Sequence, residues 1–294
     1  MTPRFKAELN LALMCVIWGS TFSLVRESLS GTDPWLFLSL RFGLAIPACL
    51  LIFGRQLDLR DAVTRRRGLG LGVVLFLAFL TQTLGLQTIS ASRSGFLTAL
   101  YIVLVPLLLA AWNLRRPSAR SLGAAGVSLA GVALLSGLSL GGEPLVLGPG
   151  EFLTLLCALL FALQILLADR LPVAGKVWSL HFWQIATVAA LSLAGWLLLG
   201  EARMRLDSQL AVSLFINSVF GTVVALGLQL RYQPDTTPER AALVYSFEPV
   251  FAALMAVWIL GEKLGPLEWL GGGLILLALR LADPGPAETH PGPV

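Results

Sequence analysis

A carboxylate lies in the middle of a long apolar segment. Glu248 is eleven residues into the apolar stretch 237–261, about 16 Å along a helix that rises about 1.5 Å per residue. An ionisable group this far from the ends of an apolar helix costs several kcal/mol unless it is paired or protonated, and it is by default functional. Glu248 is therefore expected to bind a cationic group, to carry a proton, or to stay protonated and shape the helix with adjacent Pro249.

A basic residue also lies inside an apolar segment. Arg41 is seven residues into the stretch 34–54, roughly 10 Å from its nearer end. Three outcomes are open for its long side chain: it extends to the end of the helix, pairs with a neighbour, or contacts the carboxylate of a bound solute.

Polar and aromatic side chains accompany these two charges in the other apolar stretches. Individually, such residues more often form hydrogen bonds between helices, worth about 0.5–1.5 kcal/mol. Together they predict a mildly polar cavity that suits a small neutral or zwitterionic solute. The candidates are Trp18, Ser20, Thr21, Gln82, Gln87, Thr98, Tyr101, Gln164, Trp183, Asn217, Tyr245 and Ser246.

The sequence contains no catalytic or cofactor motif of a known pattern. There is no HExxH, P-loop or GxSxG run. His181 and His290 have no evident partner for acid–base chemistry. The cysteines, which show no CxxC spacing, are Cys15, Cys49 and Cys157. We therefore expect no enzymatic activity, no metal site and no cofactor.

The elements that position these residues are predicted to be transmembrane helices. The chain is 56% hydrophobic and 13% charged, and its apolar stretches are long enough to cross a hydrocarbon core of about 30 Å. This predicts an all-α membrane protein with ten transmembrane helices. Asp33 followed by Pro34, and Thr237 followed by Pro238, are typical of helix starts. The predicted spans are 8–26, 34–54, 67–89, 94–113, 119–139, 149–169, 177–199, 207–230, 237–261 and 266–282.

The basic residues predict an orientation. The net charge of +4 and pI near 9.3 are compatible with nucleic-acid binding, but the charges gather in alternate connections, above all 55–67 and 115–120. With the N-terminus in the cytoplasm, most of the 21 Lys and Arg residues lie on that side, as the positive-inside rule requires. We expect both termini to be cytoplasmic, the lipid bilayer to be a partner, and nucleic acid not to be one.

The chain also contains an internal repeat. Residues 84–87, Leu-Gly-Leu-Gln, return as 226–229, an offset of 142, and Pro106 returns as Pro249 at 143. Leu122-Gly123 returns as Leu270-Gly271 at 148, which predicts about one extra helical turn after the second proline. Because each copy holds five spans, the second copy is inverted, as in secondary transporters. The predicted divisions are a first repeat 1–142, a second repeat 143–283 and a disordered cytoplasmic tail 284–294.

Two local patterns suggest how the helices pack and move. The mid-span prolines Pro106 and Pro249 each remove a backbone hydrogen bond, so they are candidate hinges; simple curvature is the alternative. Small residues recur at spacings of three or four in the fifth span, which favours close helix packing within a monomer or between protomers. The positions in this stripe are Ala119, Gly123, Gly126, Ala130, Ala133 and Gly137.

Several motifs together resemble the EamA-type members of the drug/metabolite transporter superfamily. The matching segments are Trp18-Gly19-Ser20-Thr21-Phe22, Arg41-Phe42, Glu248-Pro249-Val250, 260–264 and 271–281. The resemblance implies two inverted five-helix repeats with a central cavity lined mainly by helices 1, 3, 4, 6, 8 and 9. It also implies alternating access and export of amino acids, other metabolites or cationic drugs. The sequence 113–116, Asn-Leu-Arg-Arg, departs from the glycine-glutamate-lysine pattern usual at the equivalent turn.

These observations predict a multi-pass protein of the bacterial inner membrane that exports small neutral or amphipathic metabolites. Aromatic amino acids are favoured, through the aromatic amino-acid exporter branch of the superfamily. A nucleotide-sugar or phosphate-ester exchanger is an alternative, but its cavity should present several basic residues. A membrane scaffold without transport is a second alternative. The protein is expected to bind a small-molecule substrate and to be a monomer or a weak homodimer through its small-residue faces.

Overall fold

A computed structural model describes residues 2–114, 116–136, 148–260 and 265–282. The predicted tail 284–294, and 261–264 of the motif that carries the family resemblance, lie outside these residues. In the described part, the regular secondary structure is helical apart from an isolated bridge between Thr32 and Met204. Its helices are α1 (Pro3–Leu29), α2 (Pro34–Phe53), α3 (Ala62–Gly85), α4 (Ala91–Thr98), α5 (Tyr101–Trp112), α6 (Ala119–Leu135), α7 (Pro149–Arg170), α8 (Val177–Leu199), α9 (Ser208–Phe215), α10 (Ala225–Tyr232), α11 (Pro238–Tyr245), α12 (Glu248–Leu260) and α13 (Pro266–Leu281).

Three further elements complete the part of the chain that the structure describes. The 3₁₀ helices η1 (Gly54–Gln56) and η3 (Gln233–Asp235) follow α2 and α10, and the π-helix η2 (Ile216–Val224) joins α9 to α10. Asp33 and Thr237 cap α2 and α11 as predicted, accepting hydrogen bonds from the amides of Leu36 (3.0 Å) and Arg240 (3.4 Å).

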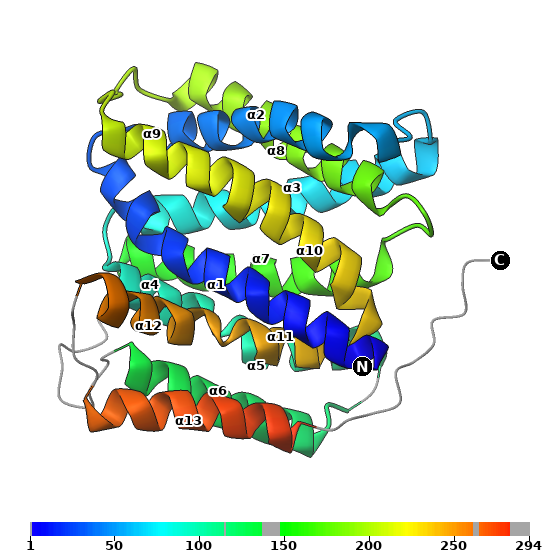
Figure 1. Ribbon diagram of the computed structural model, residues 1–294, viewed down its shortest axis with the longest axis vertical. Coiled ribbons are helices and arrows are strands. Elements are labelled where there is room, and N and C mark those ends of the chain that lie inside the picture. The colour runs from blue at the N-terminus through cyan, green and yellow to red at the C-terminus, as the bar shows by residue number, and fades with distance from the viewer. Residues whose placement is uncertain (1, 115, 137–147, 261–264, 283–294) are drawn as a thin grey trace.

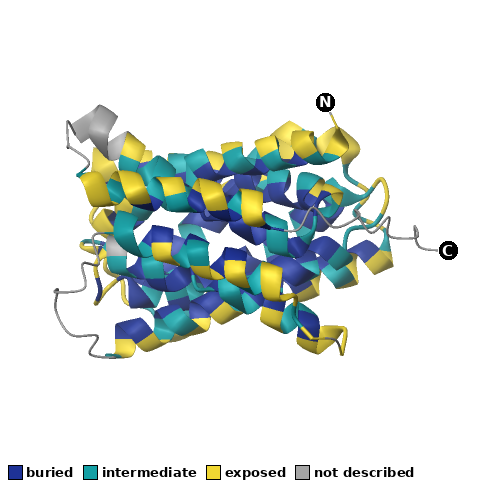
Figure 2. Ribbon diagram, turned by 90° about the horizontal axis from the view of Figure 1, so that it is seen from below, coloured by how far each residue is buried: buried dark blue, intermediate teal, exposed yellow. Residues whose placement is uncertain are grey.

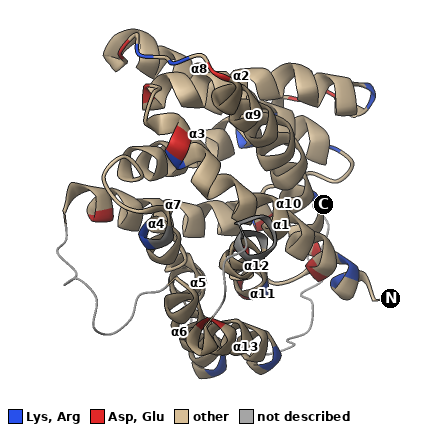
Figure 3. Cartoon of the chain, turned by 60° about the vertical axis from the view of Figure 1, so that its left-hand side comes forward, with Lys and Arg blue, Asp and Glu red and all other residues tan. Residues whose placement is uncertain are grey.

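Many of these helices are long and apolar enough to cross a membrane. Within the described residues, seven helical segments meet this condition by length and hydropathy. In Figure 3 the charged residues lie mainly near helix ends and connections. The predicted all-α membrane fold is therefore confirmed. The seven segments are Pro3–Leu29, Pro34–Gln56, Ala62–Gly85, Arg93–Trp112, Pro149–Arg170, Val177–Leu199 and Ser208–Asp235.

The helices pack side by side with their axes roughly aligned (Figure 1). Helix α3 packs against α7 and α8, α8 packs against α2, and α6 pairs with α13 at the edge of the bundle. Buried residues face the interior, and exposed residues cover the outer surface (Figure 2). That outer surface is rich in large apolar side chains, such as Leu198 with 80% exposure, as expected for helices that face lipid rather than water.

The structure corrects the predicted alignment of the two repeats. Helices α4 and α11 have eight residues each, begin after the N-caps Ser90 and Thr237, and end where the helix is interrupted at 99–100 and 246–247. These features repeat at an offset of 147, not 143. The extra residues of the second repeat therefore precede α11, as an extension of α10 and η3, and do not follow Pro249. A longer helix before the turn accounts for the shift.

This correction also changes the relation of the two prolines. Pro106 lies inside α5, which is continuous from Tyr101 to Trp112, whereas Pro249 is the second residue of α12, directly after the interruption at 246–247. They do not occupy equivalent places in their helices. Their role as hinges stays a prediction.

The predicted small-residue stripe on α6 faces outward. Gly123, Gly126 and Ala130 are exposed, and a Cβ added at either glycine would meet nothing within 4 Å; Gly137 lies outside the described residues. The close approach is made elsewhere on the helix. A Cβ at Gly131 would lie 2.6 Å from the oxygen of Gly271 in α13, and a Cβ at Gly271 would lie 2.6 Å from the oxygen of Gly131. The stripe therefore does not pack within the monomer, and its packing between protomers stays a prediction.

Candidate transport site

A cavity lies among helices of both repeats. About 660 Å³ in and at the mouth of this cavity is not filled by protein atoms, and part of that space is open to the outside. Its walls come from α1, α2, α3, α4, α5, α7, α10, α11 and α12. The lining residues are Trp18, Thr21, Phe22, Val25, Arg41, Phe79, Gln82, Thr83, Leu86, Thr98, Tyr101, Phe161, Gln164, Ile165, Gln229, Tyr245 and Glu248.

The two repeats contribute matching positions to this cavity. Helix α1 presents Trp18, Thr21 and Phe22, and α7 presents Phe161, Gln164 and Ile165, each 143 residues later. The helices interrupted at 99–100 and 246–247 also contribute equivalent positions to the cavity, at an offset of 147. The residues on either side of each interruption line the cavity, and they are Thr98, Tyr101, Tyr245 and Glu248.

Arg41 reaches the cavity from α2 and is 4% exposed. Its Nε donates a hydrogen bond to the hydroxyl of Thr222 at 3.0 Å. Its guanidinium lies 4.6 Å from the ring centroid of Phe79 and 5.4 Å from that of Phe42, within the range of cation–π attraction. Among the described residues it forms no ion pair with a carboxylate. A buried cation with only neutral partners is strongly attractive to an anionic group.

Glu248 enters the cavity from the first turn of α12. It forms no hydrogen bond or ion pair within the described part of the chain, so its carboxyl group is available to a ligand. Helix α1 approaches it closely, because a Cβ at Gly19 would lie 2.6 Å from the backbone oxygen of Glu248. Arg41 and Glu248 thus bring one basic and one acidic group, from different repeats, to the same cavity.

A hydrogen-bonded cluster of amides and a tyrosine borders the cavity. Gln164 and Gln229 donate to each other's side-chain oxygens at 3.1 and 3.0 Å. Gln229 and the Tyr245 hydroxyl both donate to Gln233 Oε1, at 3.2 and 2.7 Å, and Gln233 Nε2 donates to the backbone oxygen of Ile165 at 2.6 Å. A satisfied buried network of this kind is rigid, so it fixes the orientation of the Gln164, Gln229 and Tyr245 side chains.

The π-helix η2 is held by side chains from three other helices. Trp18 Nε1 donates to the oxygen of Gly221 at 2.9 Å, and a His181 ring nitrogen lies 2.9 Å from the oxygen of Val223. Arg41 bonds Thr222, whose hydroxyl donates to the oxygen of Asn217 at 2.8 Å. The wide turn misaligns backbone groups, and these contacts satisfy them; π-helical turns are frequent at functional sites. No group of three or more potential metal ligands occurs among the described residues.

The family model of the EamA-like transporter family matches the chain twice, over residues 5–137 and 148–282. The chain belongs to the EamA-like transporter family. This EamA-like protein is 34% identical, over 95% of its length and 86% of the relative's, to a protein of Archaeoglobus fulgidus named "Uncharacterized transporter". It is 26% identical, over 100% and 96% of the two chains, to the "Uncharacterized inner membrane transporter YedA" of Escherichia coli K12. The protein is thus a transporter with two EamA repeats.

One solved crystal structure supports the fold. It covers 95% of this EamA-like chain and 96% of its own, with a TM-score of 0.76 and 18% sequence identity, so the likeness concerns the fold alone. The resemblance implied a cavity lined by the first, third, fourth, sixth, eighth and ninth predicted spans. Residues from all six spans line the cavity of the EamA-like transporter. Helix α2 joins them through Arg41.

Several predicted site residues of this EamA-like protein lie outside the cavity. Gln87 is exposed, because α3 ends at Gly85 and Gln87 falls in the following turn, whereas its repeat partner Gln229 lies within α10. The other four are engaged elsewhere. Ser20 donates to Ile17, Asn217 to Ser213 and Ser246 to Leu243, and Trp183 packs against Gly68.

Eight lining residues were absent from the predicted site: Phe22, Val25, Phe79, Thr83, Leu86, Phe161, Ile165 and Gln229. Most are apolar or aromatic, and such residues carry no distinguishing signal in a membrane helix. The repeat held a signal for two of them. The offset of 143 relates Phe161 to the chosen Trp18, and the Leu-Gly-Leu-Gln repeat relates Gln229 to the chosen Gln87.

Proposed function

We propose that this transporter exports small zwitterionic or amphipathic metabolites, with aromatic amino acids as the favoured substrates and cationic drugs as further ones. One observation carries the proposal: Arg41 and Glu248 line the same cavity without an ion-pair partner among the described residues. An amino acid supplies an anionic and a cationic group at once. Its carboxylate would bind Arg41 and its ammonium group Glu248, so that each buried charge gains a counter-charge.

The rest of the cavity suits an apolar or aromatic side chain. Phe79, Phe161 and Trp18 offer ring faces and edges, and the amides of Gln82 and Gln164 offer hydrogen bonds. Sites for small molecules combine apolar walls with a few polar groups that fix orientation. The aromatic amino acids match both parts of this lining.

Transport would follow alternating access, with the cavity opening to each side in turn. We place the chain in a bacterial inner membrane as ten transmembrane helices, with both termini in the cytoplasm. The basic connections 55–67 and 115–120 support this orientation through the positive-inside rule. The exposed positions Gly123, Gly126 and Ala130 would support at most a weak homodimer.

A phosphate-ester or nucleotide-sugar exchanger is the second candidate, because Arg41 brings a basic group into the cavity. Against it, Arg41 is the only Lys or Arg that lines the described cavity, and Glu248 would repel a polyanion. Besides binding the ammonium group, Glu248 is a candidate carrier of a coupling proton, and this role is compatible with the export of amino acids.

Counterflow in proteoliposomes, without a pH gradient, tests the proposal. Vesicles loaded with unlabelled phenylalanine should accumulate labelled phenylalanine and tyrosine, and should exclude phosphate esters. A cationic dye and threonine extend the comparison to drugs and to polar amino acids. Exchange of phosphate esters but not of amino acids would move the assignment to the second candidate. Absence of every flux from folded protein would favour a scaffold.

A further inference from the structure

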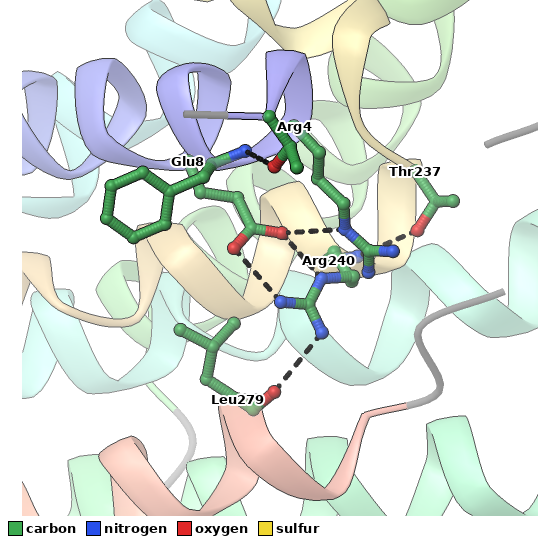
Figure 4. A network of polar contacts seen from close by, with 7 residues as sticks. Arg4, Glu8, Thr237, Arg240 and Leu279 are labelled. Atoms are coloured by element: carbon green, nitrogen blue, oxygen red, sulfur yellow. Dashed lines mark hydrogen bonds and ion pairs between the residues drawn. The ribbon is translucent and has the colours of Figure 1, made fainter. Parts of the chain in front are cut away.

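One end of the bundle is joined by a group of charges around Glu8. Glu8 Oε1 accepts hydrogen bonds from Arg4 Nε at 3.1 Å and Arg240 Nε at 2.7 Å, and Glu8 Oε2 accepts from Arg240 Nη2 at 3.0 Å. Arg240 Nη1 also donates to the backbone oxygen of Leu279 at 3.3 Å (Figure 4). The Glu8 and Arg240 side chains are only 16% and 13% exposed. This bidentate and largely buried ion pair connects α1 to the first turn of α11.

A second ion pair joins the opposite end of the bundle. Arg93 Nε lies 3.1 Å from Glu151 Oε1, with side-chain exposures of 21% and 8%. The other oxygen, Glu151 Oε2, accepts a hydrogen bond from the amide of Gly148 at 3.0 Å and so caps α7. This pair ties α7 to the first turn of α4.

The two ion pairs are equivalent by the internal repeat. Glu8 and Glu151 lie 143 residues apart, as do the cavity residues Trp18 and Phe161 on the same helices. Both arginines lie three residues after the N-cap of an interrupted helix: Arg93 follows Ser90 and Arg240 follows Thr237. In each case the glutamate belongs to one repeat and the arginine to the other. Both pairs therefore cross the boundary between the repeats.

The cavity lies between these ion pairs. Trp18 is ten residues from Glu8, and Phe161 is ten residues from Glu151, so each pair is about 15 Å from the cavity along its helix. Since α1 and α7 run in opposite directions, one pair lies on each side of the cavity. The helices they join, α1 with α11 and α7 with α4, all carry residues that line the cavity.

We propose that the two ion pairs are the gates of the transport cycle, one on each side of the cavity. We call Arg4, Glu8 and Arg240 the Glu8 gate, and Arg93 and Glu151 the Glu151 gate. In this assignment, which rests on the alternating access proposed above, the Glu8 gate faces the cytoplasm and breaks when α1 parts from α11. The Glu151 gate breaks when α7 parts from α4. The repeat symmetry makes the two openings equivalent motions in opposite directions.

Sidedness of labelling tests the gates without any substrate. Cys15, Cys49 and Cys157 are replaced by alanine, and Thr83→Cys places a reporter in the cavity. The labelling rate with an impermeant thiol reagent is then measured in right-side-out and in inside-out vesicles. Glu8→Gln should raise labelling roughly 10-fold or more from the cytoplasmic side only, since a charged hydrogen bond is lost from the closed gate. Glu151→Gln should do the same from the opposite side only.

Two further variants separate gating from damage. Asp61→Asn removes an ion pair to Lys176 at the cytoplasmic end, where Asp61 Oδ1 lies 3.0 Å from Lys176 Nζ, but it joins neither gate and should leave labelling unchanged. Arg240→Gln should raise the labelling rate as much as Glu8→Gln does. The double variant should raise it little further, because the two substitutions remove the same ion pair.

Labelling that rises equally from both sides would indicate general loosening and overturn the assignment, as would unchanged labelling in both glutamate variants. Because the reporter needs no substrate, the outcome is independent of which solute the protein carries. A failure of amino-acid counterflow with one-sided labelling would refute the proposed substrate and keep the gates.

Discussion

The backbone oxygen of Glu248 occupies the space that a side chain at position 19 would need. A Cβ at Gly19 would lie 2.6 Å from that oxygen and 3.0 Å from the amide nitrogen of Ala252. Glycine at this position therefore lets α1 and α12 approach at the level of the cavity. The contact explains the glycine of the Trp-Gly-Ser-Thr motif in physical terms: it sets the place of the only acidic residue that lines the described cavity.

Gly19→Ala is expected to displace α12 and with it Glu248. Overpacking of this kind costs about 1–3 kcal/mol, so the melting temperature in detergent should fall and amino-acid counterflow should decrease. Gly43→Ala is the matched control, because nothing lies within 4 Å of a Cβ at that helical position and alanine favours a helix by up to about 1 kcal/mol. Equal melting temperatures for both variants would contradict the close contact.

Substitutions at the two charges should separate the two ends of the substrate. Arg41→Gln should weaken phenylalanine binding by roughly 10- to 100-fold, the loss expected for a charged hydrogen bond, but should not weaken phenethylamine, which has no carboxylate. Glu248→Gln should weaken phenylalanine and phenethylamine but not 3-phenylpropionate, which has no amine. Competition against labelled phenylalanine in counterflow measures all three ligands.

The exposed Gln87 provides the control for this series, since Gln87→Ala should change none of the three affinities. A Glu248→Gln protein that keeps full counterflow but no longer responds to an imposed pH gradient would assign Glu248 to proton coupling and remove it from ammonium binding.

The pairing of α6 with α13 should depend on one glycine and not on its neighbours. Gly131→Ala would bring a Cβ to 2.6 Å from the oxygen of Gly271 and 2.8 Å from Ile275 Cγ1. A loss of about 1–3 kcal/mol is expected, seen as a lower melting temperature. Gly126→Ala, on the exposed stripe of the same helix, should leave the melting temperature unchanged or raise it. The reverse order would show that the stripe is the packed face.

The connection before α3 should make stability depend on pH in a defined direction. Hydrogen bonds from Thr64 and from Lys176 lower the pKa of Asp61 from its ordinary 3.8 to about 2. Since the folded pKa lies below the unfolded one, this contribution is complete above about pH 4 and is lost as the pH falls towards 2. The difference in melting temperature between wild type and Asp61→Asn should therefore shrink over that range.

Lys176 makes stability depend on pH in the alkaline range. Hydrogen bonds to Asp61 and Asp58 raise its pKa above the ordinary 10.5, so its contribution is complete below pH 10.5 and is lost as the pH rises beyond that value. A wild-type advantage that persisted unchanged at pH 2.5 would contradict the role of the Asp61 carboxylate.

Hydropathy and helix-start residues determine much of the fold, because a bilayer permits few alternatives to apolar helices. Asp33 and Thr237 were identified as N-caps because each is a capping residue type followed by proline. Glu248 and Arg41 were candidates because a charge in an apolar helix is costly, and both line the cavity. Physical cost was the reliable signal.

Other features depended on packing that single residues do not reveal. Gln87 and Gln229 share a motif, yet only Gln229 lines the cavity, because α10 continues for a turn where α3 ends. Pro249, which cannot donate to the Tyr245 carbonyl, marked the interruption at 246–247, but no proline follows the interruption at 99–100 within its next turn, so no breaker residue marked that one. The gate arginines looked like ordinary charges at helix ends, and only the assembled helices brought them to Glu8 and Glu151.

The π-helix Ile216–Val224 has a consequence for how this family can vary. A π-turn holds one more residue than the α-turn it replaces, so every side chain beyond it is rotated by about 100° relative to an uninterrupted helix. Gln229 faces the cavity only in that register. Closing the wide turn to α-helix without removing a residue would therefore turn Gln229 away from the cavity. Deletion of one residue within 216–224 would instead replace the π-turn by an α-turn and keep Gln229 in its present register, so a relative one residue shorter in this segment would present the same polar side chain to the cavity.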